Sequence, residues 1–486
     1  MRRLWGAVIV CALVQGEVLA QFPEDALRLA QPGAGVGVRA LGMGGAYTGV
    51  ANDFSAVYWN PAGLAQMTMG EFSGGFRYLT QTTTGDFLGS SEDYSSSATD
   101  LNSMGLVIPT PVRRGAFVLA LGYTRQANFA SGLSYGAFNP SYSIIQDYAP
   151  NGQLAWSGWE DGLASALGFT ELDSTGRFIT PIDDSLTQSA VITEDGGLNN
   201  WSAAAAIDIG QNLSLGGTLT YVAGSYGYER KYTEEDRADV YRQFPDNLAY
   251  WTLTQTVHSE ISGITGKMGL MYRIPDRFRL GIAVKFPTRY YVKEDFGERA
   301  ESFFDDGDIL PVNGPYQSQG YGEYDVVTPW VLSAGMSLIL LPNVPVWLLI
   351  HDIVLAGDID LTDWTTMRFD DATPDVMAWN SQMNTIFRPT MNLRLGAEVG
   401  LLQVFRARGG VQYFQSPYKN DGRLFDGPYD RWALTAGFGV QLGSNVMLDL
   451  AYQYGWWKNY RENDITSVVY ESTTAHNGLL SISYRF

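Results

Sequence analysis

The sequence contains a single cysteine and comparatively few charged residues. Cys11 lies in an apolar stretch near the N-terminus, so no disulfide, thiolate metal site or cysteine nucleophile is expected in the rest of the chain. Charged residues make up only 17% of the 486 residues, and acids outnumber bases to give a net charge of −19. Because nucleic acid is itself polyanionic, this balance argues against nucleic acid as a partner.

Long apolar runs are also missing. Beyond residue 20, no run approaches the length that a membrane-spanning helix requires, about 20 consecutive apolar residues. The most apolar stretch, Met336 to Ile350, is interrupted by Pro342, Asn343 and Pro345, which is typical of a hairpin turn. We therefore expect no transmembrane helix in this chain.

Histidine is scarce, which limits the chemistry that the chain can support. His258, His351 and His476 fall in separate strands and loops, a distribution that suits no metal site. His351 and Asp352 are adjacent in a predicted strand, so their side chains point to opposite faces and cannot pair directly. The glycines between positions 33 and 45 do not follow the dinucleotide-binding spacing. We expect no enzymatic activity, no metal site and no cofactor.

The N-terminus has the pattern of a cleaved secretory signal. Arg2-Arg3 is followed by an apolar stretch from Leu4 to Val14 and by the small-residue site Val18-Leu19-Ala20. This order is typical of a signal peptide, here residues 1–20, and the apolar stretch is too short to span a membrane. We expect the mature chain to begin at Gln21 and to be exported.

The C-terminus has the pattern of a strand in a membrane barrel. Counting back by twos from the C-terminal residue gives an apolar face, and the intervening positions give a mostly polar face. The first set is Phe486, Tyr484, Ile482, Leu480 and Gly478, and the second is Arg485, Ser483, Ser481, Leu479 and Asn477. Such faces meet lipid and lumen in a membrane barrel. A terminal aromatic residue is also typical of bacterial outer-membrane barrels, whose assembly machinery would be a partner of this strand.

The same alternation recurs upstream and predicts an antiparallel barrel. We expect fourteen strands, an even number that places both ends on the periplasmic side, with short turns there and longer loops at the cell surface. The predicted strands are 70–82, 101–109, 115–128, 199–209, 213–232, 252–274, 277–292, 326–341, 345–364, 383–400, 403–415, 430–442, 446–458 and 473–486. Outer-membrane lipid and lipopolysaccharide would then surround the wall.

One predicted surface loop, residues 293–325, is strongly acidic. It contains nine acids, opposed only by Lys293 and Arg299. Because the spacing of the acids is irregular, a solvated loop is favoured over a site that binds divalent cations.

Residues 33–67 differ from the rest of the chain. The stretch carries only two charges, Arg39 and Asp53, and is dominated by glycine, alanine and valine. It lacks the alternation of a wall strand, and a free periplasmic extension would be more polar. Because the wall side chains of a fourteen-stranded barrel do not fill its lumen, we expect residues 21–69 to form a plug, or hatch, inside a barrel of residues 70–486.

Three motifs in this stretch resemble the hatch of the FadL/TodX family of outer-membrane transporters. The motifs run from Gly37 to Tyr47, from Ala51 to Asp53 and from Asn60 to Leu64, the last with the sequence Asn-Pro-Ala-Gly-Leu. Together with the fourteen strands and Phe486, the resemblance covers essentially the whole mature chain. It implies passive uptake of long-chain fatty acids or other hydrophobic compounds, through an internal pocket and a lateral opening in the wall.

The resemblance assigns roles to particular residues. Asn60, Pro61, Ala62 and Gly63 would hold the hatch conformation that shapes the pocket. Arg39 would pair with Asp53 or with a ligand carboxylate, and a structural ion pair is the favoured alternative. Phe22 would line the pocket, unless the mature N-terminus is disordered.

Two further features have a functional and a structural interpretation. Gly122, inside the third strand, is a candidate kink for the lateral opening, although a glycine that fits the barrel's curvature is favoured. In the long second loop, 129–198, the side chains Trp156, Trp159, Leu163 and Leu167 have helical spacing and could form a surface capture site. The alternative is that they pack against the loop itself.

A second function shares the same fold. Some relatives of this family are protein-binding shuttles of secretion systems that receive exported proteins on their extracellular loops. The hatch motif does not distinguish the two functions. A bound amphiphile would favour transport, whereas a stable protein partner would favour the shuttle.

Overall fold

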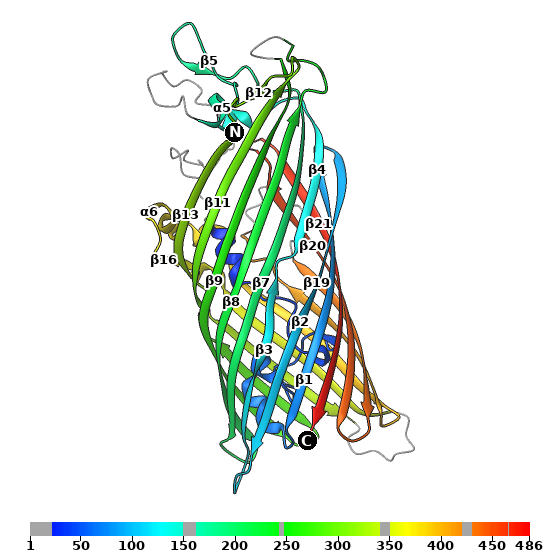
Figure 1. Ribbon diagram of the computed structural model, residues 1–486. Helices are drawn as coiled ribbons and strands as arrows, with labels where there is room; N and C mark the ends of the chain where they lie inside the picture. Colours follow the sequence, from blue (N-terminus) through cyan, green and yellow to red (C-terminus); the bar gives the residue numbers. More distant parts are fainter. Residues whose placement is uncertain (1–21, 149–161, 243–246, 341–349, 420–429, 465) are drawn as a thin grey trace, which may run out of the picture.

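The computed structural model describes residues 22–148, 162–242, 247–340, 350–419, 430–464 and 466–486. In these residues the chain forms a closed barrel of fourteen antiparallel wall strands (Figure 1). The barrel closes where β21 pairs with β1, with Tyr484 opposite Phe72. As predicted, the fold is a transmembrane β-barrel.

Three wall strands consist of two consecutive elements each, separated by two or three residues. The wall comprises β1 (Glu71–Phe87), β2 (Ser90–Thr110), β3 (Phe117–Asn128) with β4 (Ser131–Asn139), β7 (Leu186–Asp208), β8 (Leu213–Glu235), β9 (Leu248–Ile274), β10 (Phe278–Lys285) with β11 (Arg289–Phe304), β13 (Tyr316–Val327) with β14 (Val331–Leu340), β15 (Ile350–Asp363), β17 (Pro389–Leu401), β18 (Phe405–Phe414), β19 (Arg431–Leu442), β20 (Val446–Glu462) and β21 (Val468–Arg485).

The remaining elements are short and lie in the lumen or in the loops. The luminal elements are α1 (Pro23–Ala30), α2 (Val38–Gly42), α3 (Ala56–Trp59) and the 3-10 helix η1 (Pro61–Gln66). The loop elements are α4 (Ile145–Tyr148), α5 (Leu163–Ala166), β5 (Glu171–Leu172), β6 (Phe178–Ile179), β12 (Ile309–Leu310), η4 (Trp364–Thr366), β16 (Arg368–Asp370), α6 (Pro374–Ala378), η5 (Trp379–Ser381) and α7 (Met383–Ile386). No helix in the described part of the chain is long and apolar enough to cross a membrane.

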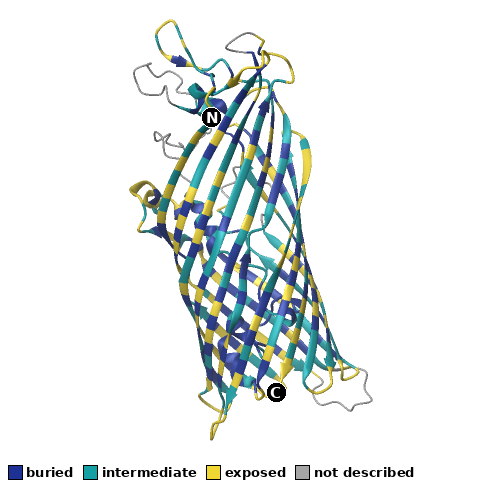
Figure 2. Cartoon of the chain, in the orientation of Figure 1, coloured by how far each residue is buried: buried dark blue, intermediate teal, exposed yellow. Residues whose placement is uncertain are grey.

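The wall strands alternate between an exposed apolar face and a buried face (Figure 2). On β21, Leu480, Ile482 and Tyr484 point outward and are about half exposed, whereas Leu479 and Asn477 point inward and are buried. Large apolar side chains on the outer face of a closed barrel are stable only against lipid. The alternation therefore assigns the outer face to the membrane.

All fourteen predicted strands are present, but several begin earlier at the long-loop end. β2 begins at Ser90 rather than at 101, and β7 begins at Leu186 rather than at 199. The prediction placed a strand over 383–400, whereas residues Met383–Ile386 form α7 and the strand begins at Pro389. The wall thus continues beyond its lipid-facing band, where outward residues are polar and the apolar alternation is lost.

The acidic stretch 293–325 is not the solvated loop that we predicted. It forms most of a hairpin in which β11 pairs with β13, for example Glu294 with Gly322. Successive acids of β11 alternate between faces, so Glu294 is buried in the lumen while Asp295 is exposed outside. Among the described residues no cluster of His, Cys, Asp or Glu side chains is suited to hold a metal ion.

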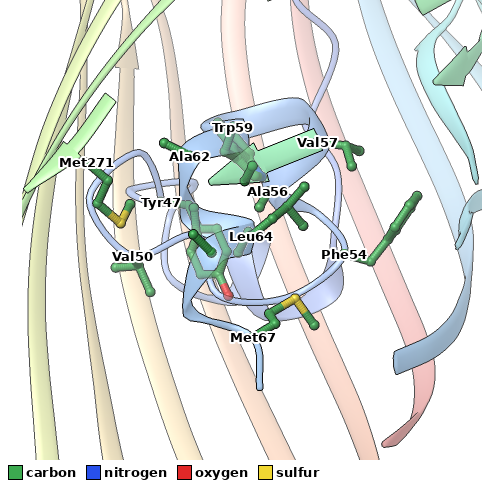
Figure 3. Packing of buried hydrophobic residues seen from close by; sticks show 14 of the residues in the cluster. Tyr47, Val50, Phe54, Ala56, Val57, Trp59, Ala62, Leu64, Met67 and Met271 are labelled. Atoms are coloured by element: carbon green, nitrogen blue, oxygen red, sulfur yellow. The ribbon is translucent and has the colours of Figure 1, made fainter. Parts of the chain in front are cut away.

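The N-terminal segment, residues 22–67, lies inside the barrel (Figure 1). Its helices α2 and α3 and the 3-10 helix η1 contact strands on opposite sides of the wall, including β8, β9, β19 and β20. Tyr47, Val50, Trp59 and Leu64 are at most 5% exposed and form one apolar cluster with inward residues of the wall (Figure 3). This compact core positions the functional site described next.

Candidate functional site

The Asn-Pro-Ala-Gly element of the N-terminal segment forms a tight, buried turn. The Asn60 side chain accepts from the Ala62 amide (3.1 Å), and it donates to the Thr48 carbonyl (3.0 Å) and the Leu270 carbonyl of β9 (3.2 Å). A side chain attached to Gly63 would place its Cβ only 2.0 Å from the Ala51 carbonyl oxygen. Asn60 thus caps η1 and bonds to the wall, and Gly63 allows the two backbones to meet.

A buried charge network anchors the N-terminal segment to the wall. Arg39 donates two hydrogen bonds to Glu398 of β17 (2.7 and 2.8 Å) and one to Asn52 (2.6 Å). Glu398 also accepts from Arg408 (2.6 Å), which bonds Asp449 (2.5 Å). Arg39 is therefore a structural ion-pair residue, as favoured from the sequence, and its partner lies in the wall.

Asp53, the partner suggested for Arg39, joins this network indirectly. Tyr47 donates to Asp53 Oδ2 (2.5 Å) and accepts from Arg39 Nη1 (3.1 Å). Asp53 Oδ1 also accepts from the amide and the hydroxyl of Ser55 (2.9 and 2.6 Å). No direct Arg39–Asp53 ion pair is present in this network, and Tyr47 bridges the two side chains.

Glycines on the inner wall admit the backbone of the N-terminal segment. A Cβ at Gly281 would lie 2.1 Å from the Thr48 carbonyl oxygen, and one at Gly396 would lie 2.0 Å from the Met43 carbonyl oxygen. Sequence reasoning missed these residues. The available signal was glycine at inward positions of the wall strands β10 and β17.

Helix α1 lies above this turn, toward the long-loop end. It begins with proline and two acids and has Arg28 in its last turn, an order that matches the helix dipole. Arg28 pairs with Asp25 (2.5 Å) and lies 4.0 Å from the centroid of the Tyr226 ring. The apolar face of α1 packs in a group that we call the α1 cluster, whose buried members include Leu27, Leu29, Leu198, Val222, Ile261, Tyr290, Val292, Tyr324, Phe369 and Met383.

Phe22 lies at the edge of the α1 cluster. Its side chain is 43% exposed, and its ring packs edge-on against Trp379 at a centroid distance of 6.1 Å. Trp379 belongs to the loop that covers the cluster. Phe22 is therefore in contact with a loop residue at the edge of the α1 cluster.

The pairing between β2 and β3 ends partway up the wall. The two strands are paired from Ser103–Thr124 down to Thr110–Phe117, and within the described strands β2 has no backbone partner on this side above Ser103. The β3–β7 register also shifts between Arg125 and Ala127. A side-chain contact from Asn128 to Asp100 (2.9 Å) spans the break. We call this break the β2–β3 gap.

Gly122 lies just below the β2–β3 gap and is not itself the irregularity. It is paired with Gly105 on one side and with Ser202 on the other. Cβ atoms at Gly105 and Gly122 would lie 2.1 and 2.4 Å from the Phe54 ring, which points from the N-terminal segment toward the wall (Figure 3). A larger residue at Gly122 would collide with Phe54, which gives this glycine a steric reason of its own.

The N-terminal segment covers the β2–β3 gap from inside. A Cβ at Gly33 would lie 2.1 Å from the Gln126 carbonyl oxygen at one edge of the gap. At the other edge, Asn102 is fully buried, accepts from the Gly37 amide (3.3 Å) and donates to the Gly35 carbonyl (3.4 Å). Residues 33–37 therefore separate the gap from the lumen.

An apolar groove lies on the outer face immediately below the gap. It has a volume of about 590 Å³. Its floor includes Gly105 and Gly122, and its sides are exposed apolar side chains that include Phe72, Met104, Leu121, Trp201, Leu219 and Tyr221. The groove and the gap thus adjoin one another on the same part of the described wall.

The predicted surface capture site is only partly described. Leu163 and Leu167 are buried in a cluster with Phe169, Trp251 and Phe304, so these two leucines pack against their own loop and the strand ends. Trp156 and Trp159 lie outside the described residues. The two leucines thus follow the structural alternative that we gave for this helix-like pattern.

A buried carboxyl group faces α1 above the membrane. Glu294 is 3% exposed and accepts from Ser259 (2.7 Å) and Tyr324 (3.1 Å). Its outward neighbours on β11, Lys293 and Asp295, are charged and exposed, so this level lies beyond the lipid-facing band. Burial, together with the nearby Asp25 carboxylate, raises the pKa of Glu294 from 4.5 to about 7.

The raised pKa of Glu294 predicts that the long-loop end of the barrel becomes less stable as the pH rises. Between pH 4.5 and pH 7 the unfolded chain loses the proton while the folded barrel keeps it, so stability falls through this window and levels off above it. The full effect is about 3 kcal/mol. The hydrogen-exchange protection factors of α1 amides, which are corrected for the intrinsic pH dependence of exchange, should therefore fall from pH 5 to pH 8 in the native protein and much less in a Glu294→Gln variant.

Glu260→Gln is the matched control, because Glu260 lies on β9 with its side chain exposed. Exchange in that variant should follow the native protein. If Glu294→Gln also follows the native protein, the titration of Glu294 does not control α1.

Solved structures share this fold at low sequence identity. The Pseudomonas putida toluene transporter TodX aligns over 93% of this chain and 99% of its own, with 15% identity and a TM-score of 0.54. The monoaromatic hydrocarbon channel CymD aligns over 93% and 98%, with 17% identity and a TM-score of 0.51. A Pseudomonas aeruginosa FadL homologue aligns over 93% and 98%, with 15% identity and a TM-score of 0.56. No protein-family model matches the chain, and no curated protein matches it significantly.

These similarities establish the fold and confirm the FadL/TodX-type barrel that the sequence predicted. The alignments extend over almost the full length of both chains.

Proposed function

We propose that this barrel takes up hydrophobic compounds passively across a bacterial outer membrane, with the N-terminal segment as its hatch. The observation that carries the proposal is the β2–β3 gap, which is covered inside by residues 33–37 and adjoins the apolar groove outside. Burying a methylene group is worth about 0.8 kcal/mol, so a long apolar chain resists a water-filled exit. A lateral route into lipid avoids that cost.

The structural neighbours support this proposal. TodX is described as a toluene transporter and CymD as a monoaromatic hydrocarbon channel. In the proposed route, ligand reaches the lumen near α1 and leaves when residues 33–37 move away from the gap. This movement requires no covalent chemistry, so the protein acts without enzymatic turnover.

The proposal includes export of the chain through a signal peptide and assembly of the barrel through its C-terminal strand. A signal peptide at residues 1–20 would direct the chain to the periplasm, and the strand that ends in Phe486 would be recognised by the barrel-assembly machinery. The Phe486 residue is 56% exposed, and its backbone exchanges hydrogen bonds of 2.8 and 2.9 Å with Gly70, just before the first wall strand. Lipopolysaccharide would surround the outer part of the wall.

Uptake of radiolabelled toluene and dodecanoate tests the proposed function. Cells that produce the protein should accumulate at least one probe faster than cells that lack it. Equal accumulation of both probes would reject transport, and a purified barrel that retains a specific exported protein would then favour the secretion shuttle.

An Asn102→Leu substitution tests the lateral route. Leucine keeps the branching at Cγ but leaves the Gly35 carbonyl and the Gly37 amide without their partner, so residues 33–37 should be held less firmly. The long hydrogen bonds suggest a loss of about 1 kcal/mol, which corresponds to a roughly fivefold faster initial uptake.

Asn477→Leu is the matched control for this substitution. Asn477 is a buried luminal asparagine that donates to Gln453 (3.0 Å) on the wall, away from the gap. Unchanged uptake by Asn102→Leu, or an equal increase in both variants, would argue against the β2–β3 gap as the exit.

A further inference from the structure

Small residues continue the outer groove down the lipid-facing side of the wall. Ala203 of β7 is exposed, lines the groove and lies in register between Leu121 of β3 and Leu219 of β8. In the row below, toward the periplasmic end, Ala205 lies beside Gly217. Because the two leucines project outward and the small residues do not, a straight apolar chain that runs along the wall fits between them.

Aromatic side chains form the upper end of the groove. Tyr123, Trp201 and Tyr221 lie next to one another in register on β3, β7 and β8, and all three line the groove. The rings of Tyr123 and Trp201 pack edge-on at a centroid distance of 5.2 Å. Tyrosine and tryptophan gather where membrane hydrocarbon meets the lipid headgroups. This aromatic row therefore marks the headgroup level beside the groove.

An arginine lies one row above the aromatic row, on the same outer face. Arg125 of β3 is partly exposed and is paired in register with Asn199 of β7. Its guanidinium donates to Asn199 Oδ1 (2.8 Å) and to the Gly196 carbonyl (2.9 Å). Both acceptors are neutral, so these contacts orient the guanidinium but leave its positive charge uncompensated.

The carboxylates around Arg125 are directed elsewhere. Asp100 is paired with the buried, luminal Arg77 at 2.8 Å. Asp195, further up β7, lies over β8, where a Cβ at Gly227 would be 2.4 Å from its Oδ1. Within the described residues Arg125 forms no ion pair. The fold thus holds an unpaired cation at the headgroup level, directly above an apolar groove.

The head of an occupant must provide the selectivity of such a site. An acyl chain gains little when it leaves bulk lipid for an apolar groove, because both surroundings are hydrocarbon. Arginine, by contrast, forms short charge-assisted hydrogen bonds with phosphate, and its planar fork matches the phosphate oxygens. Membrane lipids that carry phosphate present it at the headgroup level, where Arg125 lies.

We propose that Arg125 and the outer groove bind one phosphate-bearing membrane lipid. The phosphate pairs with the Arg125 guanidinium, and one acyl chain lies in the groove between Leu121 and Leu219. The inference goes beyond the uptake of hydrophobic compounds and does not depend on it. It gives the groove an occupant from the membrane, on the opposite side of the wall from the N-terminal segment.

Dimyristoyl phosphatidate and dimyristoylglycerol test this site, because the two lipids share their acyl chains and differ only in the phosphate. The full-length protein is purified in a mild detergent, stripped of bound lipid and titrated with each probe by native mass spectrometry. Native protein should bind the phosphatidate about tenfold more tightly than dimyristoylglycerol, as expected for a charge-assisted hydrogen bond. Arg125→Met should abolish this preference without changing the binding of dimyristoylglycerol. Arg125→Lys, which keeps the charge but not the planar fork, should retain part of it.

Ala203→Leu tests the groove without altering the arginine. The added side chain occupies the space between Leu121 and Leu219, so both probes should bind several-fold more weakly. Ala436→Leu is the matched control, because Ala436 is exposed on the outer face of β19 and is not part of the groove. That variant should bind both probes as the native protein does.

Lys458→Met is the control for charge, because Lys458 is exposed at the long-loop end of β20. Its affinities should equal those of the native protein, and heat-modifiable migration on gels verifies that each variant is folded. Equal binding of both probes by the native protein, or an equal loss in Lys458→Met and Arg125→Met, overturns the phosphate site. Equal binding by Ala203→Leu and Ala436→Leu overturns the placement of the acyl chain. Full competition by millimolar inorganic phosphate shows a site for small anions and overturns the lipid assignment.

Discussion

Replacing Arg39 with leucine is expected to release the hatch from the wall. The substitution leaves the buried Glu398 carboxylate with Arg408 as its only cationic partner and removes the contacts to Asn52 and Tyr47. Removing one member of a buried ion pair costs about 3–5 kcal/mol, because an undercompensated charge remains. Single-channel conductance in planar bilayers should rise several-fold, and cells should become sensitive to large hydrophilic antibiotics.

Two further variants show whether the undercompensated charge of Glu398 causes the rise in conductance. In the double variant Arg39→Leu with Glu398→Leu no unpaired carboxylate remains, and Arg408 keeps Asp449, so much of the low conductance should return. Arg113→Leu, in an exposed short turn, should behave as the native barrel. If the single Arg39 variant conducts like the native barrel, the hatch is held by its apolar core rather than by this network.

Replacing Gly396 with valine is expected to displace the hatch by collision. A Cβ at this position lies 2.0 Å from the Met43 carbonyl oxygen, and the two additional methyl groups have no space in the lumen. Valine itself favours strands, so β17 and the barrel should still form. Overpacking costs about 1–3 kcal/mol or more when backbone must move, and the outcome should be a folded barrel with higher conductance.

Gly478→Val separates this collision from a general effect of losing glycine. Gly478 pairs with outward-facing Tyr78 and Tyr452, and a Cβ there meets nothing within 4 Å. This variant should keep the low conductance of the native protein. High conductance in both variants, or in neither, would contradict close backbone approach as the reason for Gly396.

Much of the barrel could be predicted because lipid imposes a strict local pattern. Each membrane crossing must alternate between lipid and lumen, so strands such as β20 and β21 are visible in a few residues of sequence. Beyond the lipid-facing band the constraint ends, and both strand faces become polar. For that reason β2 and β7 were predicted too short, and the β11–β13 hairpin was mistaken for a loop.

The burial of the N-terminal segment was predictable from composition, but its attachment to the wall was not. A charge-poor stretch rich in glycine has to be buried, whichever surface buries it. The partner of Arg39 could not be predicted from local sequence, because Glu398 is 359 positions away. In the same way, Leu163 and Leu167 have helical spacing whether they face a ligand or their own loop, and only packing decides which.

The sequence by itself determined the barrel, its strands and the presence of a buried N-terminal segment, because these follow from period-two alternation and local composition. Tertiary structure decided which strand pairing is broken, which wall glycines meet the hatch and which side chains border the outer groove. These features depend on the register between strands that are distant in sequence. Arg125 shows the distinction: it is an ordinary strand arginine in the sequence, and only the β3–β7 register places it one row above Trp201 at the groove.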